Sequence, residues 1–73
     1  MIVAIGKRVT VSDVETSTEQ NFHIVAPGQS NPSEGKLSSD SPIGRALSGH
    51  GSGDTVIVNL PRGQRQLTIL TVV

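Results

Sequence analysis

The stretch "SDSPIGRALSGHGSGDTV", Ser39 to Val56, combines a start signal and a stop signal for one short helix, with a strand directly behind it. Ser41 is a favourable N-cap, and Pro42 suits the first helical position because its missing N–H would have no partner there. Three apolar residues recur at the i, i+3, i+4 spacing of one helix face: Ile43, Ala46 and Leu47. Gly49 offers the left-handed position that ends a helix. The sequence therefore predicts a helix of about two turns that needs a sheet to pack against.

Alternating apolar and polar residues on both sides of this helix predict strands. Residues 7–15 and 19–27 alternate in this way and are joined by a short polar segment, so we expect an antiparallel hairpin. Residues 54–60 and 65–73 form a second such pair. The "PRGQ" segment at 61–64 supplies a tight turn between them.

Residues 27–39 form a polar loop that is longer than most connections in small domains. A short extended piece over residues 36–38 is expected to return the chain to the sheet. The order is β, β, long loop, short helix, β, β. This order predicts one α+β domain over residues 1–73, with a twisted antiparallel sheet wrapped around a single helix.

The composition excludes several classes of function. The 73 residues include six basic and six acidic side chains, no cysteine, and Phe22 as the only aromatic residue. A net charge of zero and a single aromatic do not suit a nucleic-acid binder, so we expect a protein partner and no sequence-specific nucleic-acid binding. Two distant histidines without thiols predict no metal or cofactor. The apolar run at residues 1–5 is too short for a signal peptide or membrane span, so a soluble, cytoplasmic chain is expected.

The glycine tract "GHGSGD" at residues 49–54 is similar in letters to a phosphate-binding loop. Such loops follow a strand and open a helix, whereas this tract follows a helix and opens a strand, so we interpret it as a connector. The sequence also contains the three residue types of a hydrolase triad, at Ser41, His50 and Asp54. The sequence has no nucleophile elbow, and His50 lies among glycines that would orient it poorly, so no such activity is expected.

Two further pairs of charges each allow more than one interpretation. Asp13 and Glu15 share a strand face, which fits a weak cation site but better fits solvated charges beside a turn. Arg62 and Arg65 at the last turn either contact an acidic partner or keep a sheet edge soluble. His23 is expected to be a side chain on the partly exposed face of its strand.

Four segments together resemble one known family: "IGKRVTVSDVET", "EGKLSSDSPIGRAL", "GHGSGDTVIVNLP" and "RGQRQLTIL". They are similar to the C-terminal globular domain of the Gre-type (GreA/GreB) bacterial transcript-cleavage factors, whose relatives include the nucleoside diphosphate kinase regulators. The resemblance implies an FKBP-like fold that docks at the rim of the RNA polymerase secondary channel. The contact residues that it implies here are Asp40, Ser41, Pro42 and Arg45. Capping explains Ser41 and Pro42, so Asp40 is the residue we assign mainly to the partner.

The chain also departs from this family. Gre-type factors carry an N-terminal coiled coil whose tip carboxylates help to hold a catalytic metal ion in the polymerase, and this sequence has no heptad pattern. We therefore expect a monomer that binds bacterial RNA polymerase without cleaving transcripts. A relative of the nucleoside diphosphate kinase regulators that binds polymerase or competes with cleavage factors is the alternative. A factor that stimulates cleavage by itself is a third hypothesis. The FKBP-like fold also occurs in prolyl isomerases, but one aromatic residue is too few to line the pocket of such an enzyme, so we expect no isomerase activity.

Overall fold

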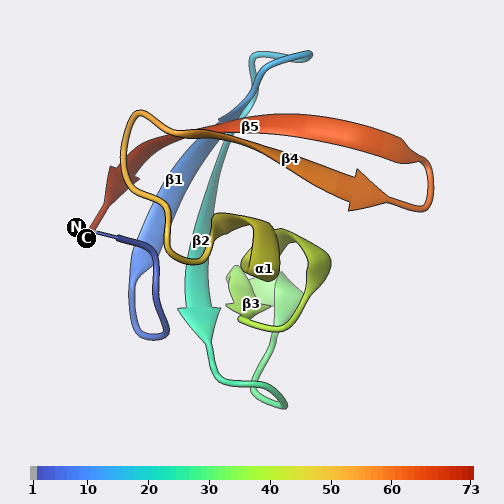
Figure 1. The fold of residues 1–73 in the computed structure, drawn as a ribbon. Helices are drawn as coiled ribbons and strands as arrows, with labels where there is room; N and C mark the ends of the chain where they lie inside the picture. The colour runs from blue at the N-terminus through green and yellow to red at the C-terminus, as the bar shows by residue number, and fades with distance from the viewer. Residues whose placement is uncertain (1) are drawn as a thin grey trace.

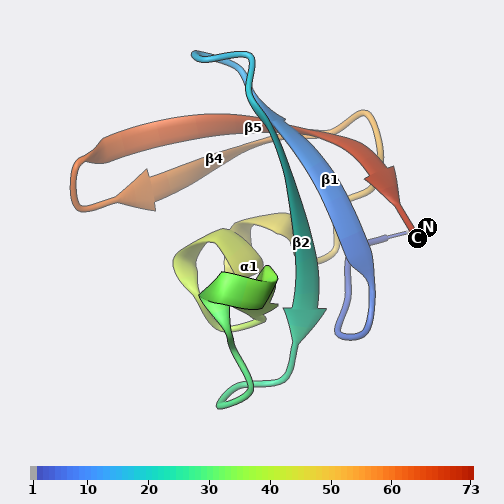
Figure 2. The ribbon, with the colours of Figure 1, turned by 180° about the vertical axis from the view of Figure 1, so that it is seen from behind.

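The computed structural model describes residues 2–73 as one curved sheet around one short helix (Figure 1). In chain order the elements are β1 (Arg8–Asp13), β2 (Glu19–Val25), the 3-10 turn η1 (Pro32–Glu34), β3 (Lys36–Ser38), α1 (Pro42–Leu47), β4 (Thr55–Leu60) and β5 (Gly63–Val72). The sheet curls so that α1 lies on its concave side (Figures 1 and 2). The α+β prediction is confirmed, as are the helix and the short extended piece before it.

The sheet is mixed, which corrects the prediction of a wholly antiparallel one. Its strand order is β3-β2-β1-β5-β4, and every neighbouring pair is antiparallel except β2 and β3. β3 lies parallel to β2, with His23 beside Lys36 and Val25 beside Ser38. A parallel neighbour needs a connection long enough to bring the chain back to the end where the first strand began. The loop over residues 26–35 provides that return. The prediction was wrong because an alternating pattern of apolar and polar residues does not reveal the direction of a strand.

The core consists of inward-facing residues of the strands, one residue of the helix and one residue near the N-terminus. Nine side chains form it, each at most 5% exposed: Val3, Val9, Val11, Ile24, Leu47, Val56, Val58, Leu67 and Ile69. Val3 belongs to the N-terminal apolar run, to which the sequence analysis gave no structural role. Its N–H donates to the His50 carbonyl at 2.8 Å, and its carbonyl accepts from the Gly49 N–H at 3.0 Å. Val3 therefore completes the core next to the loop that follows α1.

In the hairpin of β4 and β5, the second strand begins at Gly63, earlier than the sequence predicted. Leu60 pairs with Gly63, so the turn is reduced to Pro61 and Arg62, and Gly63 has a φ of 130°, a conformation that favours glycine. The far end of this hairpin projects sideways beyond α1 (Figures 1 and 2). Between residues 2 and 73, no helix is both long enough and apolar enough to cross a membrane.

Candidate docking site

The start of α1 is fixed by the cap that the sequence predicted. Ser41 adopts an extended conformation, and its hydroxyl oxygen accepts a hydrogen bond from the Gly44 N–H at 3.1 Å. The same hydroxyl donates to the carbonyl of Ser38 at 2.7 Å. Pro42 occupies the first helical position. The hydroxyl of Ser41 therefore ties the first turn of the helix to the end of β3.

Gly44 lets the helix come unusually close to the end of β3. A β-carbon at this position would lie 2.2 Å from the carbonyl oxygen of Ser38 and 3.1 Å from the carbonyl carbon of Ser39. No side chain fits such a gap, so only glycine allows this packing. The role of Gly44 was not predicted from the sequence, because a glycine inside a helix pattern gives no sign of what it faces.

Asp40 has a local role that capping did not predict. Its carboxylate accepts a hydrogen bond from the hydroxyl of Ser38, and the side chain is otherwise exposed. Asp40 thus has a hydrogen-bond partner within the domain, and its assignment mainly to a protein partner stays a prediction. One carboxylate oxygen is held by Ser38, and the group still presents its negative charge to solvent.

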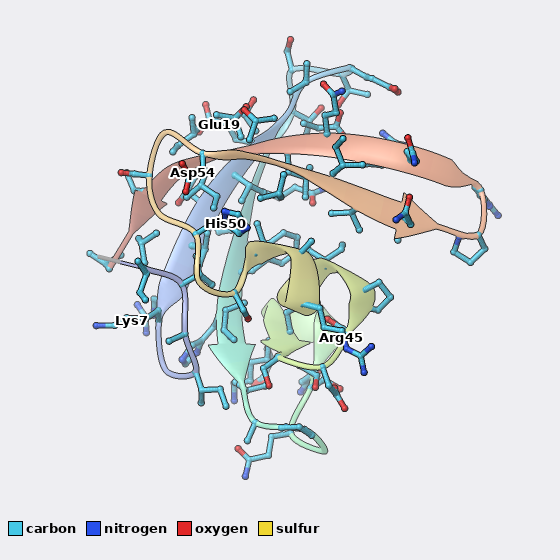
Figure 3. All side chains as sticks on the ribbon, in the orientation of Figure 1. Lys7, Glu19, Arg45, His50 and Asp54 are labelled. Atoms are coloured by element: carbon cyan, nitrogen blue, oxygen red, sulfur yellow. The ribbon has the colours of Figure 1, made fainter. Side chains whose placement is uncertain are left out.

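The four residues that the resemblance implied as contacts occupy one short segment at the start and first turns of α1. Asp40, Pro42 and Arg45 are exposed, whereas Ser41 is half-buried and engaged in the cap. The side chain of Arg45 points away from the helix (Figure 3) and forms no ion pair within residues 2–73. The segment therefore offers an anionic group, a rigid proline and a cationic group close together on the surface.

The structure does not assemble a hydrolase triad. His50 Nδ1 lies 3.5 Å from Asp54 Oδ2, and both side chains are about half exposed in the loop after α1 (Figure 3). Asp54 also accepts the Gly51 N–H at 2.9 Å, which tightens the loop. The Ser41 hydroxyl donates its hydrogen bond to the Ser38 carbonyl and not to a histidine. The glycine tract is a connector, as predicted.

Asp13 is buried at 8% exposure, so the prediction that it is a solvated charge is wrong. Its Oδ1 accepts the Glu15 N–H at 2.9 Å and its Oδ2 receives Arg65 Nη1 at 2.9 Å. Burial alone would raise the pKa of Asp13, but hydrogen bonds from the Glu15 and Thr16 amides and from Arg65, with the attraction of its guanidinium, outweigh this and lower the pKa below its usual value.

Glu15 lies in the turn after β1, so it does not share a strand face with Asp13 as the sequence predicted. His23 is half-buried on β2. Within the described residues, no three His, Asp or Glu side chains gather closely enough to form a metal site. The electrostatic interactions of this part of the molecule are therefore those of an ion pair and a tight turn.

Comparison with known proteins agrees with the resemblance noted in the sequence. Residues 1–73 match the family model described as transcription elongation factor, GreA/GreB, C-term. The transcription elongation factor GreA of Halalkalibacterium halodurans is 39% identical over 71 residues, which is 97% of this chain and 45% of that protein. GreA of Brucella canis is 41% identical over 68 residues, 93% of this chain and 43% of that protein. The chain thus spans less than half the length of these relatives.

Solved structures give the same result for the fold. The GreA factor homolog 1 of Thermus thermophilus superposes with a TM-score of 0.85 at 27% identity, over 100% of this chain and 49% of that one. A GreA/GreB elongation factor from Nitrosomonas europaea superposes with a TM-score of 0.79 at 26% identity, over 97% of this chain and 60% of that one. These structures agree with the FKBP-like arrangement predicted for the sheet and helix. The chain belongs to the C-terminal domain family of the GreA/GreB transcription elongation factors.

Proposed function

We propose that residues 1–73 form a single docking unit that binds bacterial RNA polymerase at the rim of its secondary channel and does not itself stimulate transcript cleavage. The observation that carries this proposal is the exposed segment at the start of α1. Asp40 and Pro42 are exposed there, while the hydrogen bonds of Ser41 hold the backbone between them. A rigid surface segment loses little conformational freedom on binding, which favours affinity.

The proposed contacts have different roles. Asp40 supplies a charge, Pro42 a fixed apolar surface, and Arg45 a cation that has no ion-pair partner in the described part of the chain. Ser41 acts indirectly, because its hydroxyl is already used by Gly44 and Ser38. We therefore propose that Asp40 and Arg45 contact the partner directly and that Ser41 positions them.

We propose the absence of cleavage activity because of how the carboxylates of this chain are arranged. Metal-assisted RNA cleavage needs carboxylates that can reach a metal ion at the reaction centre. Within the described residues, no three His, Asp or Glu side chains gather closely enough to hold a metal ion, and Asp13 is already engaged by Arg65 and two amides. The alternative, a relative of the nucleoside diphosphate kinase regulators that competes with cleavage factors, uses the same docking surface and differs in its effect on transcription.

The test is binding of the chain to core RNA polymerase in competition with a full-length GreA factor, with RNA cleavage scored in the same stalled complexes. Asp40→Asn is the sharpest variant, because it removes the charge while leaving an oxygen for the Ser38 hydroxyl. We expect it to weaken binding by about tenfold. Glu19→Gln is the matched control, since Glu19 is also exposed and lies far from Arg45 (Figure 3).

Equal affinity of Asp40→Asn and the parent would remove Asp40 from the docking site. Cleavage above background in complexes that contain this chain and no other factor would reject the non-catalytic part of the proposal. Competition by the parent without cleavage would support both parts. Whether transcription then speeds up or slows down would separate an elongation factor from an inhibitory relative.

A further inference from the structure

Two cationic side chains and a histidine form a row on the convex face of the sheet, which is turned away from α1. Arg8 of β1 is paired with His23 of β2, and His23 is paired with Lys36 of β3. Side chains of directly paired residues lie on the same face of a sheet. Arg8 is exposed whereas the next residue, Val9, is buried in the core, so the row faces solvent. Figure 2 shows β1 and β2 from this side.

The row lies in a hollow of about 530 Å³. Thr10 of β1 and Asn21 of β2 also line it. Thr10 Oγ1 donates a hydrogen bond to Asn21 Oδ1 at 2.7 Å, which leaves the amide N–H groups of Asn21 as further donors at the hollow. Small-molecule sites have volumes of about 300 to 1,000 Å³. The hollow therefore suits a small molecule that has several acceptor atoms.

The positive charge of the row is only partly balanced. Arg8 forms no ion pair within residues 2–73. Lys36 Nζ lies 3.8 Å from Glu34 Oε2, which is beyond hydrogen-bond distance, and the same oxygen accepts from Asn31 Nδ2 at 2.9 Å. The carboxyl end of Val73 closes one side of the hollow, where its oxygen accepts the Arg8 N–H at 3.0 Å. Like charges on one sheet face repel each other, so an anion held between Arg8 and Lys36 would relieve this repulsion.

We infer that this row binds the phosphate group of a small phosphate-bearing molecule. Neighbouring strands lie about 4.8 Å apart, so the backbones at Arg8 and Lys36 are about 10 Å apart, with His23 between them. A phosphate monoester has three terminal oxygens and a charge of about −1.5 to −2 at neutral pH. It can therefore accept hydrogen bonds from both cations and from a ring N–H of His23 at the same time. A carboxylate has two oxygens and a single charge, so it would leave one of these donors unused.

The phosphate site differs from the proposed docking site in place and in chemistry. It lies on the opposite face of the sheet from α1, so the inference does not depend on polymerase binding. A nucleic-acid strand would need cationic contacts to several phosphates and aromatic rings for stacking. The row supplies two full cations, and the chain has a single aromatic residue, so a small ligand is favoured over a nucleic acid.

The experiment follows the backbone amide signals of the isotope-labelled chain by NMR while inorganic phosphate is added. We expect saturable shifts at the amides around the hollow, with a dissociation constant on the order of 1 mM. Acetate at matched ionic strength should bind about tenfold more weakly, because it cannot use all the donors. Glycerol phosphate should bind at least as tightly as inorganic phosphate. Binding of inorganic phosphate alone would show a site for the free ion and overturn the assignment to a phosphate ester.

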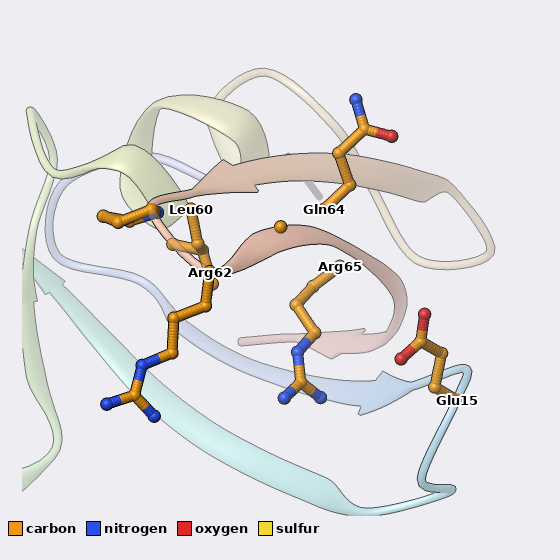
Figure 4. A pocket seen from close by; sticks show the side chains of 7 residues that line it. Glu15, Leu60, Arg62, Gln64 and Arg65 are labelled. Atoms are coloured by element: carbon orange, nitrogen blue, oxygen red, sulfur yellow. The ribbon is translucent and has the colours of Figure 1, made fainter.

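Charge variants show whether the row itself holds the anion. Arg8→Gln and Lys36→Gln should each weaken phosphate binding by about tenfold, because each removes one charged donor. His23→Phe keeps a ring but removes its N–H, so it should weaken binding as well. Arg62→Gln is the matched control. Arg62 is exposed at the turn of the β4–β5 hairpin (Figure 4) and does not line the hollow, so the affinity of this variant should stay within about twofold of the parent.

Melting temperatures of all variants show whether a loss of affinity reflects loss of the fold. If Arg8→Gln does not fold, Lys36→Gln on a different strand gives the same test. Equal weakening by Arg8→Gln and Arg62→Gln would show that phosphate responds only to net charge and would overturn the inference. Shifts that rise without saturation, or that spread to Arg45 and Arg62, would overturn it too. Saturable binding that is lost only in variants of the row would support it, whatever the outcome for polymerase.

Discussion

The two halves of the β4–β5 hairpin differ in what holds them in place. In the half near α1, four side chains are at most 5% exposed: Val56, Val58, Leu67 and Ile69. Residues 61–66 at the tip are all exposed, and the tip extends beyond the helix (Figure 1). The side chains at the tip therefore do not pack into the core. The packed half of the hairpin only fixes the position of the tip.

Arg65 is the exception in the tip, because it joins the hairpin to the turn after β1 through Asp13. The Gln66 carbonyl adds a second contact to the same turn by accepting a hydrogen bond from the Val14 N–H at 2.9 Å. These two contacts hold a tip that lacks apolar packing. The comparison teaches that one half of the hairpin maintains the fold, whereas the other half is a rigidly placed surface. The expected effects of substitutions on stability should therefore fall from the packed half to the tip.

The largest loss of stability is expected from a substitution where the packed half of the hairpin meets the helix. Leu47→Ala should lower the free energy of unfolding by about 2 to 5 kcal/mol, because it removes buried methyl groups and leaves a cavity. Leu47 is fully buried in the core. Chemical denaturation measures the effect, with Ile57→Ala on the exposed face of β4 as the control. A Leu47→Ala chain as stable as the parent would mean that the helix packs through another face.

Gly44→Ala is expected to have the second largest effect and to lower the free energy of unfolding by about 1 to 3 kcal/mol. The added methyl group would lie 2.2 Å from the Ser38 carbonyl oxygen, so α1 must move away from β3. Thermal unfolding measures the loss of stability. Binding to polymerase should weaken as well, because the same shift moves Asp40 and Pro42. Unchanged stability would show that α1 can move without cost and that the close approach does not hold it.

Asp13→Asn tests the ion pair that joins Arg65 in the tip to the turn after β1. The folded-state pKa of Asp13 is lowered, so its carboxylate stabilises the fold above the usual pKa near 4, and this contribution is lost as the pH falls through the folded-state pKa. We expect the variant to melt below the parent at pH 7 and the gap between them to shrink below about pH 4. A gap independent of pH would show that the ionised form of Asp13 does not matter. Glu19→Gln, an exposed carboxylate, is the control.

The smallest effect on stability is expected at the tip itself. Arg62→Ala should change the free energy of unfolding by less than about 0.5 kcal/mol, because Arg62 is exposed and has no ion-pair partner in the described residues. Chemical denaturation under the conditions used for Leu47→Ala gives the comparison directly. A large loss of stability would show that the tip helps to hold the fold together and would remove the difference between the two halves.

The helix could be predicted from sequence because its signals are local. Ser41, Pro42 and Gly49 act within a few residues of the helix ends, and the structure confirms that α1 starts at Pro42 and that Gly49 is left-handed with a φ of 83°. The strands were predicted for the same reason, since side-chain alternation is a property of consecutive residues. The segment proposed for docking was found only through its resemblance to a family.

Other features depend on residues far apart in the chain. Asp13 and Arg65 are separated by 52 positions, and nothing near either residue indicates the other. The parallel pairing of β3 depends on where the loop over residues 26–35 turns back. The hollow between α1, the turn after β1 and the hairpin likewise combines distant segments, so no sequence window contains it.

The sequence by itself determined the elements of this protein: where the helix begins and ends, which faces of the strands are apolar, and which family the chain resembles. These follow from capping, side-chain periodicity and residue order, which act over a few bonds. Only the tertiary structure decided the burial of Asp13 and its ion pair with Arg65, the requirement for glycine at position 44, and the hollow between α1 and the hairpin. Each of these depends on the distance between atoms of distant segments, which is set by how the sheet curls around the helix.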